Sequence, residues 1–185
     1  MIEIRPLEFG DVFEIVPKRH CDARGFFSET WSRRALAEAG VELDFVQDNH
    51  SRSEPAGTLR GLHFQIPPRA QAKLVRVVRG AIMDVVVDIR KGSQTFGRWA
   101  GLEVSAEKWN QVLIPCGYAH GFVTLVPETE VVYKVTDFYS PEQCRTIRYD
   151  DPTIGIVWPI HLAPFELSAN DSAAPLLAEV DTGFA

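Results

Sequence analysis

One histidine in the middle of the sequence has a side chain suited to proton transfer or to metal binding. His63 lies in "TLRGLHFQ", which reads as a β-strand. Strict strand alternation would place three neighbours on the face of this histidine: Leu59, Gly61 and Gln65. A lone histidine in a strand is more often a core residue, so the segment alone leaves packing, metal binding and chemistry open.

Two charged residues occur in strand patterns that are otherwise apolar. Lys73 begins "KLVRVV" and shares its parity with Val75 and Val77, where an ammonium is costly to bury without a partner or a task. It could instead extend to water at the strand entrance. Asp84 in "AIMDVVVD" could orient an imidazole. We expect it on the solvent face, which the pattern favours slightly.

The segment "IPCGYAHGF", which contains His120, resembles the second sequence motif of the cupins, small double-sheet barrels that often hold a metal. The first cupin motif would give an H-x-H pair followed by a glutamate. Here Gln65 stands two residues after His63, and no glutamate occurs between Gln65 and Arg90. Two histidines are too few for a closed metal site, so we expect no metal.

Composition and charge narrow the class of protein. The chain has 185 residues, 45% of them hydrophobic, which suffices for one domain over residues 1–185 with a sizeable core. A net charge of -6 argues against general nucleic-acid binding. The N-terminus has no signal-peptide pattern and no apolar run is long enough to span a bilayer, so we expect a cytoplasmic protein. The three cysteines, Cys21, Cys116 and Cys144, are predicted to be free thiols.

Period-two apolar patterns and closely spaced turns predict an all-β fold, either a sandwich or a closed barrel. The expected strands are "LDFVQDNHS", "TLRGLHFQ", "KLVRVVRG", "AIMDVVVDIRKG", "RWAGLEVS", "NQVLIP", "GFVTLV" and "EVVYKVTDFY". Only "SRRALAEAG" predicts a helix, with serine before it and glycine after it. After Asp150, prolines and small polar residues predict a C-terminal segment that wraps over the barrel.

Eight segments in order resemble one family over nearly the whole chain. They are "DARGFFSETW", "VQDNHSRS", "TLRGLHFQ", "KLVRVVRGAIMDVVVDIRKGSQTFGRW", "IPCGYAHGF", "YKVTDFYSPE", "DDPTIGIVWP" and "LSANDSAAP". Together they resemble the dTDP-4-dehydrorhamnose 3,5-epimerases. The resemblance implies a cupin-like double-sheet jelly-roll barrel with short helices, a dTDP-sugar substrate, no metal or other cofactor, and a homodimer that exchanges sheets.

The resemblance also implies catalytic roles. The family's substrate is a 4-keto sugar whose ketone acidifies the protons on C3 and C5, so a base, an acid and a stabilised enolate oxygen are needed. His63 matches the base and Asp171 the carboxylate paired with it. Tyr133 matches the acid on the opposite face, and Lys73 the cation near the C4 oxygen. Without these companions, Tyr133 would read as an ordinary strand residue.

Further residues match ligand-binding positions of the family. Arg24 and Arg60 match pyrophosphate contacts, Tyr139 the ring that stacks on thymine, and His120 a sugar contact. Polar positions around the ligand are matched by Glu29, Gln47, Asp48 and Asn49. Alternation would put Arg60 opposite His63, so either a bulge at Gly61 brings it back or Arg60 serves a neighbouring subunit.

Two departures affect only peripheral contacts: Cys144 stands where the family commonly has glutamate, and Asn170 where it has lysine or arginine. The resemblance favours epimerisation at both C3 and C5. The alternatives are an epimerase acting on one centre, a 3,4-ketoisomerase on a related dTDP-4-keto sugar, and a sugar-binding cupin without catalysis.

Overall fold

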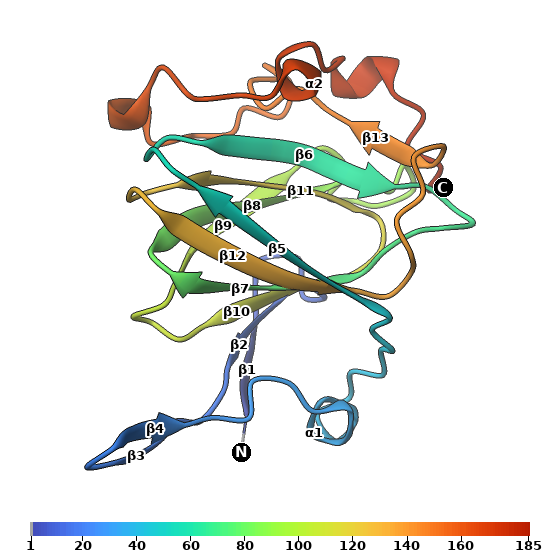
Figure 1. The fold of residues 1–185 in the computed structure, drawn as a ribbon. Helices are drawn as coiled ribbons and strands as arrows, with labels where there is room; N and C mark the ends of the chain where they lie inside the picture. The colour runs from blue at the N-terminus through green and yellow to red at the C-terminus, as the bar shows by residue number, and fades with distance from the viewer. Residues whose placement is uncertain (1) are drawn as a thin grey trace.

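The structure, a computed structural model that describes residues 2–185, contains two facing β-sheets and a separate small hairpin (Figure 1). The six-stranded sheet has the spatial order β1 (Glu3–Pro6), β2 (Phe13–Val16), β10 (Gln111–Ile114), β7 (Lys73–Arg79), β12 (Thr129–Val135) and β5 (Gln47–Ser53). The five-stranded sheet has the order β13 (Cys144–Thr146), β6 (Leu59–Gln65), β11 (Tyr118–Thr124), β8 (Ala81–Asp88) and β9 (Trp99–Ser105).

The main core lies between the two sheets. Strand pairs within both sheets are antiparallel, and every second side chain points inward. Val75 and Val77 of β7 therefore meet Ile82 and Val86 of β8 in one buried cluster. This arrangement of two packed antiparallel sheets is a jelly roll of the cupin type, which confirms the predicted all-β fold.

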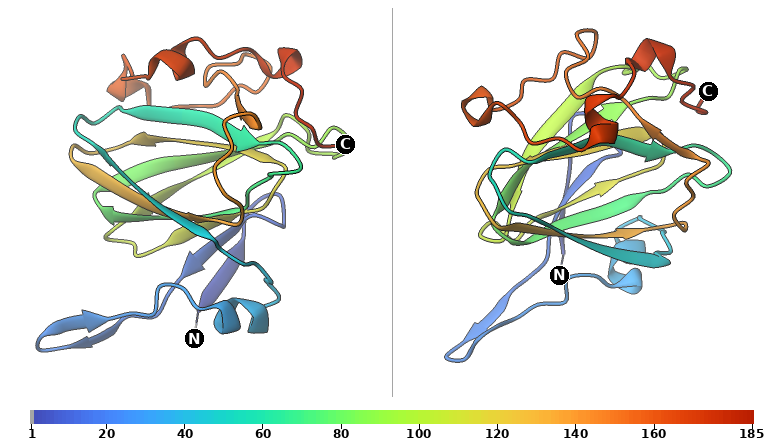
Figure 2. Two further views of the ribbon diagram at one scale, coloured as in Figure 1. Left: turned by 45° about the vertical axis from the view of Figure 1, so that its right-hand side comes forward. Right: turned by 45° about the horizontal axis from the view of Figure 1, so that its top comes forward.

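The outer face of the five-stranded sheet is covered by the C-terminal segment (Figures 1 and 2). This segment contains three short helices, η1 (Ile160–Leu162), α2 (Ala169–Ser172) and η2 (Leu177–Glu179). Trp158 and Leu177 pack there against Val85 and Val87 of β8. Strand β8 is thus buried on both faces, which explains its nearly continuous run of apolar residues. The predicted C-terminal wrap is confirmed.

The N-terminal region lies beside the six-stranded sheet and extends away from it. Helix α1 (Arg33–Glu38) begins after Ser32, whose hydroxyl caps it, and Leu36 packs on the outer face of the sheet, as the predicted helix requires. Strands β3 (His20–Asp22) and β4 (Gly25–Phe27) form a hairpin that projects from the barrel (Figure 1). No helix within residues 2–185 combines the length and apolar character needed to cross a membrane.

The first four strands and β13 were not predicted. They have three or four residues each, and β3 and β4 are exposed along their whole length, so they have no period-two apolar pattern. The three cysteines are free thiols, as predicted.

A β-bulge in β6 changes which side chains share a face. His63 pairs with His120, but Arg60 pairs with Phe122, so β6 has one residue more than β11 in this interval. Alternation is therefore reversed at Gly61. The expected common face for Leu59 and His63 was wrong, because Leu59 packs in the outer cluster. Arg60 and His63 instead line the same cavity. Of the two alternatives for Arg60, a bulge at Gly61 or service to a neighbouring subunit, the structure therefore shows the bulge.

Candidate active site

A cavity of about 580 Å³ lies between the two sheets, where the edge strands β5 and β13 approach each other. The predicted site residues that line it are His63, Lys73, Tyr133, Asp171, Gln47, Asn49, Arg60, His120 and Tyr139. They come from both sheets, from the loop after β12 and from helix α2. The fold thus brings together side chains that are up to 124 positions apart (171 − 47).

His63 is held by a buried carboxylate. Its Nε2 lies 2.6 Å from Asp171 Oδ1, and the Asp171 side chain is 3% exposed. Ser168 caps helix α2 and donates from its hydroxyl to Asp171 Oδ2 at 2.9 Å, which fixes the carboxylate. Burial alone would raise the pKa of Asp171, but the hydrogen bonds from His63 and Ser168 lower it below its usual value. Asp171 is therefore an ionised partner for the imidazole.

Lys73 lies on the inner face of the sheet. Of its two predicted positions, buried on the apolar face or extended to water, the structure shows the buried one. The residue is buried, and its Nζ donates to the backbone carbonyl of His63 at 3.1 Å. Burial lowers the pKa of Lys73 to about 8, while the negative charge of Asp84 acts in the opposite direction. The side chain therefore places a titratable cation beside His63.

Asp84 was expected on the solvent face, and this expectation was wrong. The carboxylate is 0% exposed, and its Oδ2 lies 2.8 Å from His120 Nε2. Asp84 thus orients an imidazole, the other alternative that the sequence offered. The physical reason is that both faces of β8 are buried, so the strand has no solvent face to accept a carboxylate.

Tyr133 lies on the wall opposite His63. Tyr133 belongs to β12 of the six-stranded sheet and His63 to β6 of the five-stranded sheet. Burial raises the pKa of the Tyr133 phenol, and the charge of Arg60 acts in the opposite direction. The phenol therefore keeps its proton and can donate it within the cavity.

The polar wall of the cavity is formed by β5 and by the loop that follows β12. Gln47 Nε2 donates to Asn49 Oδ1 at 2.8 Å, and Gln47 Oε1 accepts from the backbone N–H of Tyr139 at 3.1 Å. The Tyr139 ring is exposed and available for stacking. Arg60 donates to Ser53 Oγ at 3.3 Å, which holds its guanidinium at the cavity.

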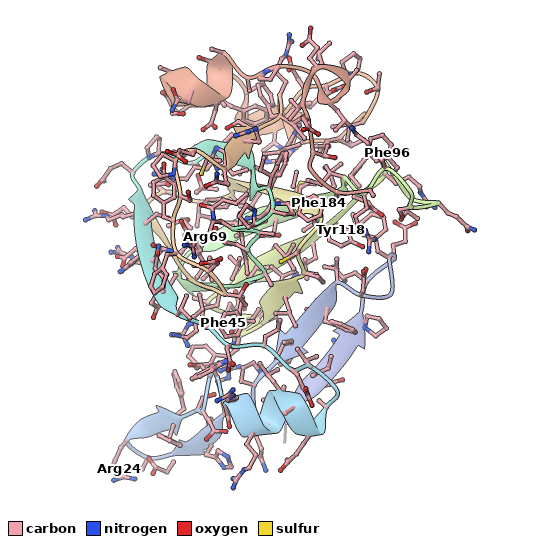
Figure 3. The ribbon with its side chains drawn as sticks, turned by 90° about the vertical axis from the view of Figure 1, so that its right-hand side faces the viewer. Arg24, Phe45, Arg69, Phe96, Tyr118 and Phe184 are labelled. Atoms are coloured by element: carbon pink, nitrogen blue, oxygen red, sulfur yellow. The ribbon has the colours of Figure 1, made fainter. Side chains whose placement is uncertain are left out.

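Three predicted residues do not line the cavity of their own chain. Alternation in β5 turns Asp48 to the face opposite Gln47 and Asn49, where it accepts from Lys134 Nζ at 2.9 Å, and its contact with the ligand stays a prediction. Arg24 lies at the tip of the β3–β4 hairpin, with its side chain 89% exposed and paired with Asp22 (Figure 3). Glu29 follows this hairpin and is also exposed.

Several cavity residues were not predicted as site residues. Gln65 donates to Arg69 O at 2.6 Å and accepts from the backbone of Ser140 at 2.8 Å, which anchors the loop that carries Tyr139. Its parity with His63 was the available signal. The remaining residues in this group are Ser51, Phe64, Gln71, Phe122, Arg145, Thr146 and Ser168. The two departures from the family pattern, Cys144 and Asn170, also line the cavity.

No group of three or more histidine, cysteine, aspartate or glutamate side chains suited to a metal occurs within residues 2–185. A reaction without metal or cofactor remains a prediction, which a chelator experiment can test.

A base on one wall and a proton donor on the other can remove a proton from one face of a carbon and return one to the opposite face. Fold and site together define a cupin-type acid–base isomerase.

Comparison with known proteins gives the family. A sequence model of the dTDP-4-dehydrorhamnose 3,5-epimerases matches residues 6–179. The enzyme of that name from Salmonella typhimurium is 51% identical over 90% of this chain and 91% of its own length. The chain belongs to the dTDP-4-dehydrorhamnose 3,5-epimerase family.

Two solved structures place the fold in the same group. The dTDP-6-deoxy-D-glucose-3,5-epimerase from Legionella pneumophila, in complex with dTDP-4-keto-L-rhamnose, superposes with a TM-score of 0.93 at 43% identity, over 98% of this chain and 95% of that one. ChmJ, a 3'-monoepimerase from Streptomyces bikiniensis in complex with dTDP-quinovose, has a TM-score of 0.85 at 36% identity, over 94% of this chain and 87% of that one.

Proposed function

We propose that this protein epimerises dTDP-4-dehydro-6-deoxy-D-glucose at C3 and C5 and so forms dTDP-4-dehydro-L-rhamnose. The observation that carries the proposal is the His63–Asp171 pair, at 2.6 Å, in a cavity whose opposite wall presents Tyr133. Similarity to enzymes of this name over most of the chain supports the choice of substrate.

The reaction uses the two walls in sequence. His63 takes the proton from C3 or C5, and the electron pair moves toward the C4 oxygen, which becomes an enolate. Lys73, a cation in a buried setting, stabilises this charge. Tyr133 then delivers a proton to the opposite face of the carbon. Asp171 stabilises the imidazolium that forms on His63, and exchange with solvent returns both side chains to their starting states.

The nucleotide half of the substrate has its own contacts. The Arg60 guanidinium faces the cavity beside the sugar site and suits a pyrophosphate oxygen. The exposed Tyr139 ring offers a stacking surface for thymine, and Gln47 and Asn49 give polar contacts. Cys144 and Asn170 lie at the same cavity, so their departures from the family pattern affect affinity rather than proton transfer.

The protein acts as a homodimer in which the β3–β4 hairpin reaches the partner's cavity. The hairpin projects from the barrel (Figure 1). Its residue Phe27 is 72% exposed, which is unfavourable unless another surface covers it. Arg24 at its tip has only Asp22 as an ionic partner within the described residues. Arg24 and Glu29 do not line the cavity of their own chain, and in the dimer they would contact the ligand in the partner's cavity.

We expect residues 1–185 to act as one domain and the reaction to take place in the cytoplasm. A dTDP-sugar carries the charges of a pyrophosphate and does not cross a bilayer unaided. Cell fractionation tests the location.

One alternative is epimerisation at a single centre, which the similarity to the 3'-monoepimerase ChmJ favours. Proton NMR of dTDP-4-keto-6-deoxyglucose in deuterated water, with chelator-treated protein, separates the candidates. Loss of both the C3 and the C5 proton signals is the expected result. Loss of one signal would identify a single-centre epimerase, and a shift of the carbonyl to C3 would identify a ketoisomerase. Binding without exchange would leave a non-catalytic sugar-binding cupin.

A further inference from the structure

A buried carboxylate behind the cavity-lining His120 has no assigned task in the proposed reaction. Asp84 is 0% exposed, and only its Oδ2 has a hydrogen-bond partner, His120 Nε2 at 2.8 Å. Its Oδ1 is buried and has no partner within residues 2–185. A half-satisfied buried carboxylate costs stability, so its contribution to folding does not explain its presence.

The strand register fixes the geometry of this pair. Asp84 of β8 lies opposite Phe122, and His120 of β11 lies opposite Val86, so the two side chains are diagonal neighbours on the inner face. With Nε2 turned to Asp84, the other ring nitrogen is Nδ1. Nδ1 has no protein partner in the described part of the chain, and it is not among the fully enclosed polar atoms, while His120 lines the cavity.

The electrostatic surroundings determine the protonation of His120. Burial lowers its pKa; Asp84 raises it, and the positive charges of Lys73 and His63 lower it further. The ring is therefore neutral near pH 7 and carries one proton. A hydrogen bond in which the Asp84 oxygen accepts from His120 requires that proton on Nε2. Nδ1 then presents a lone pair.

We propose that Asp84 is a positioning residue that fixes His120 as the Nε2-protonated tautomer, so that Nδ1 accepts a hydrogen bond from a hydroxyl group of the sugar. This rests on the proposed function. Lys73 can only donate, and so it suits the ketone oxygen, whereas His120 in this form can only accept from the ligand, and so it suits a hydroxyl. Lys73 and His120 together would bind a ketone and a neighbouring hydroxyl group and so fix the orientation of the sugar ring.

The first test measures the tautomer directly in the wild-type protein. Two-bond proton–nitrogen NMR correlations of the five histidines, with His120 assigned by its loss in His120→Gln, should show His120 neutral and protonated on Nε2. A cationic ring or an Nδ1-protonated ring would overturn the proposal. This measurement needs no active enzyme, so it stands apart from the proposed function, which fails instead if the wild-type protein catalyses no deuterium exchange.

The second test uses kinetics. Asp84→Asn should change the tautomer signal and raise KM for the keto sugar nucleotide about tenfold, the effect of one lost hydrogen bond, while Kd for dTDP alone stays within about twofold. Asp150→Asn, on an exposed residue paired with Arg148, is the control and should change neither. Equal losses for dTDP and for the sugar nucleotide would indicate a merely structural role and overturn the proposal.

A double-variant cycle shows through which residue Asp84 acts. If Asp84 works through His120, then Asp84→Asn combined with His120→Gln should raise KM no more than about twofold beyond His120→Gln alone. Additive increases in KM would mean that Asp84 acts through Lys73 and not through His120, and would overturn the proposal. Should Asp84→Asn fail to fold, Asp84→Glu keeps the charge, and the wild-type tautomer remains decisive.

Discussion

Asp171 Oδ1 lies 2.6 Å from His63 Nε2, and water has almost no access to this carboxylate. The two residues are 108 positions apart, and helix α2 brings the carboxylate over strand β6. Because Nε2 is occupied by Asp171, Nδ1 is the ring nitrogen that takes the substrate proton in the reaction we propose. An ionised Asp171 stabilises the resulting imidazolium and fixes the ring orientation.

Replacing Asp171 with asparagine should lower the rate of deuterium exchange at C3 and C5 by at least about 100-fold, because the amide does not stabilise a positive imidazole. Proton NMR in deuterated water measures this rate. Affinity for dTDP should stay within about twofold, since the nucleotide half uses other residues. Asp181→Asn on the exposed surface is the control. An Asp171→Asn variant with the full exchange rate would remove Asp171 from the mechanism.

Exchange should slow as pH rises through about 8. In this range Lys73 loses its proton, because burial lowers its pKa to about 8, and a neutral amine no longer stabilises the enolate. Tyr133 is not the cause, since burial raises the pKa of its phenol above the ordinary value of 10. The pH profile of kcat checks this. In Lys73→Arg, which stays charged, the alkaline decline should disappear; its persistence there would assign the decline to another group.

The sequence pattern placed Lys73 but misplaced Asp84, and burial explains the difference. Strand β7 alternates, with Leu74 and Arg76 off the inner face, so its parity identifies Lys73 as an inward residue. In β8 both faces are buried, one by the opposite sheet and one by the C-terminal segment. An apolar run of this kind gives no indication of which side a carboxylate takes. The distant partner Asp171 was reached only through the family resemblance, because no local pattern connects it with His63.

The sequence indicated a bulge at Gly61 as one of two explanations for the position of Arg60, but it did not decide between them. A glycine in a strand permits a bulge or a close backbone approach, and the structure contains both. Its φ is +128°, and a Cβ there would lie 2.5 Å from Gly121 Cα. This backbone geometry turns Arg60 and His63 into the same cavity, a result that strict alternation excludes.

Gly61→Ala should therefore lower the free energy of unfolding by roughly 2–4 kcal/mol, since neither the φ value nor the neighbouring backbone can accommodate a methyl group. Urea unfolding measures the change. Gly92→Ala is the matched control: its φ is not in the left-handed region, the nearest atom would lie 3.4 Å away, and its effect should stay within about 0.5 kcal/mol. Equal effects of the two substitutions would show that the bulge at Gly61 does not require glycine.

The proposed exchange of hairpins between subunits predicts that two defective subunits can complement each other. Arg24→Ala removes the hairpin's cation but keeps His63, whereas His63→Ala removes the base but keeps Arg24. The Arg24 side chain is 89% exposed, so its loss should leave the fold intact. In a heterodimer of the two variants, the cavity that retains His63 would receive Arg24 from its partner and would be complete.

Co-expression with two affinity tags isolates this heterodimer. At substrate concentrations below KM, its exchange activity should reach about half that of the wild-type dimer, because one of two sites is intact. Each parent variant alone should be slower, Arg24→Ala because it binds the pyrophosphate weakly and His63→Ala because it lacks the base. Activity no higher than the mean of the two parents would mean that Arg24 does not act in the partner's cavity, and failure to form a heterodimer would contradict the dimer itself.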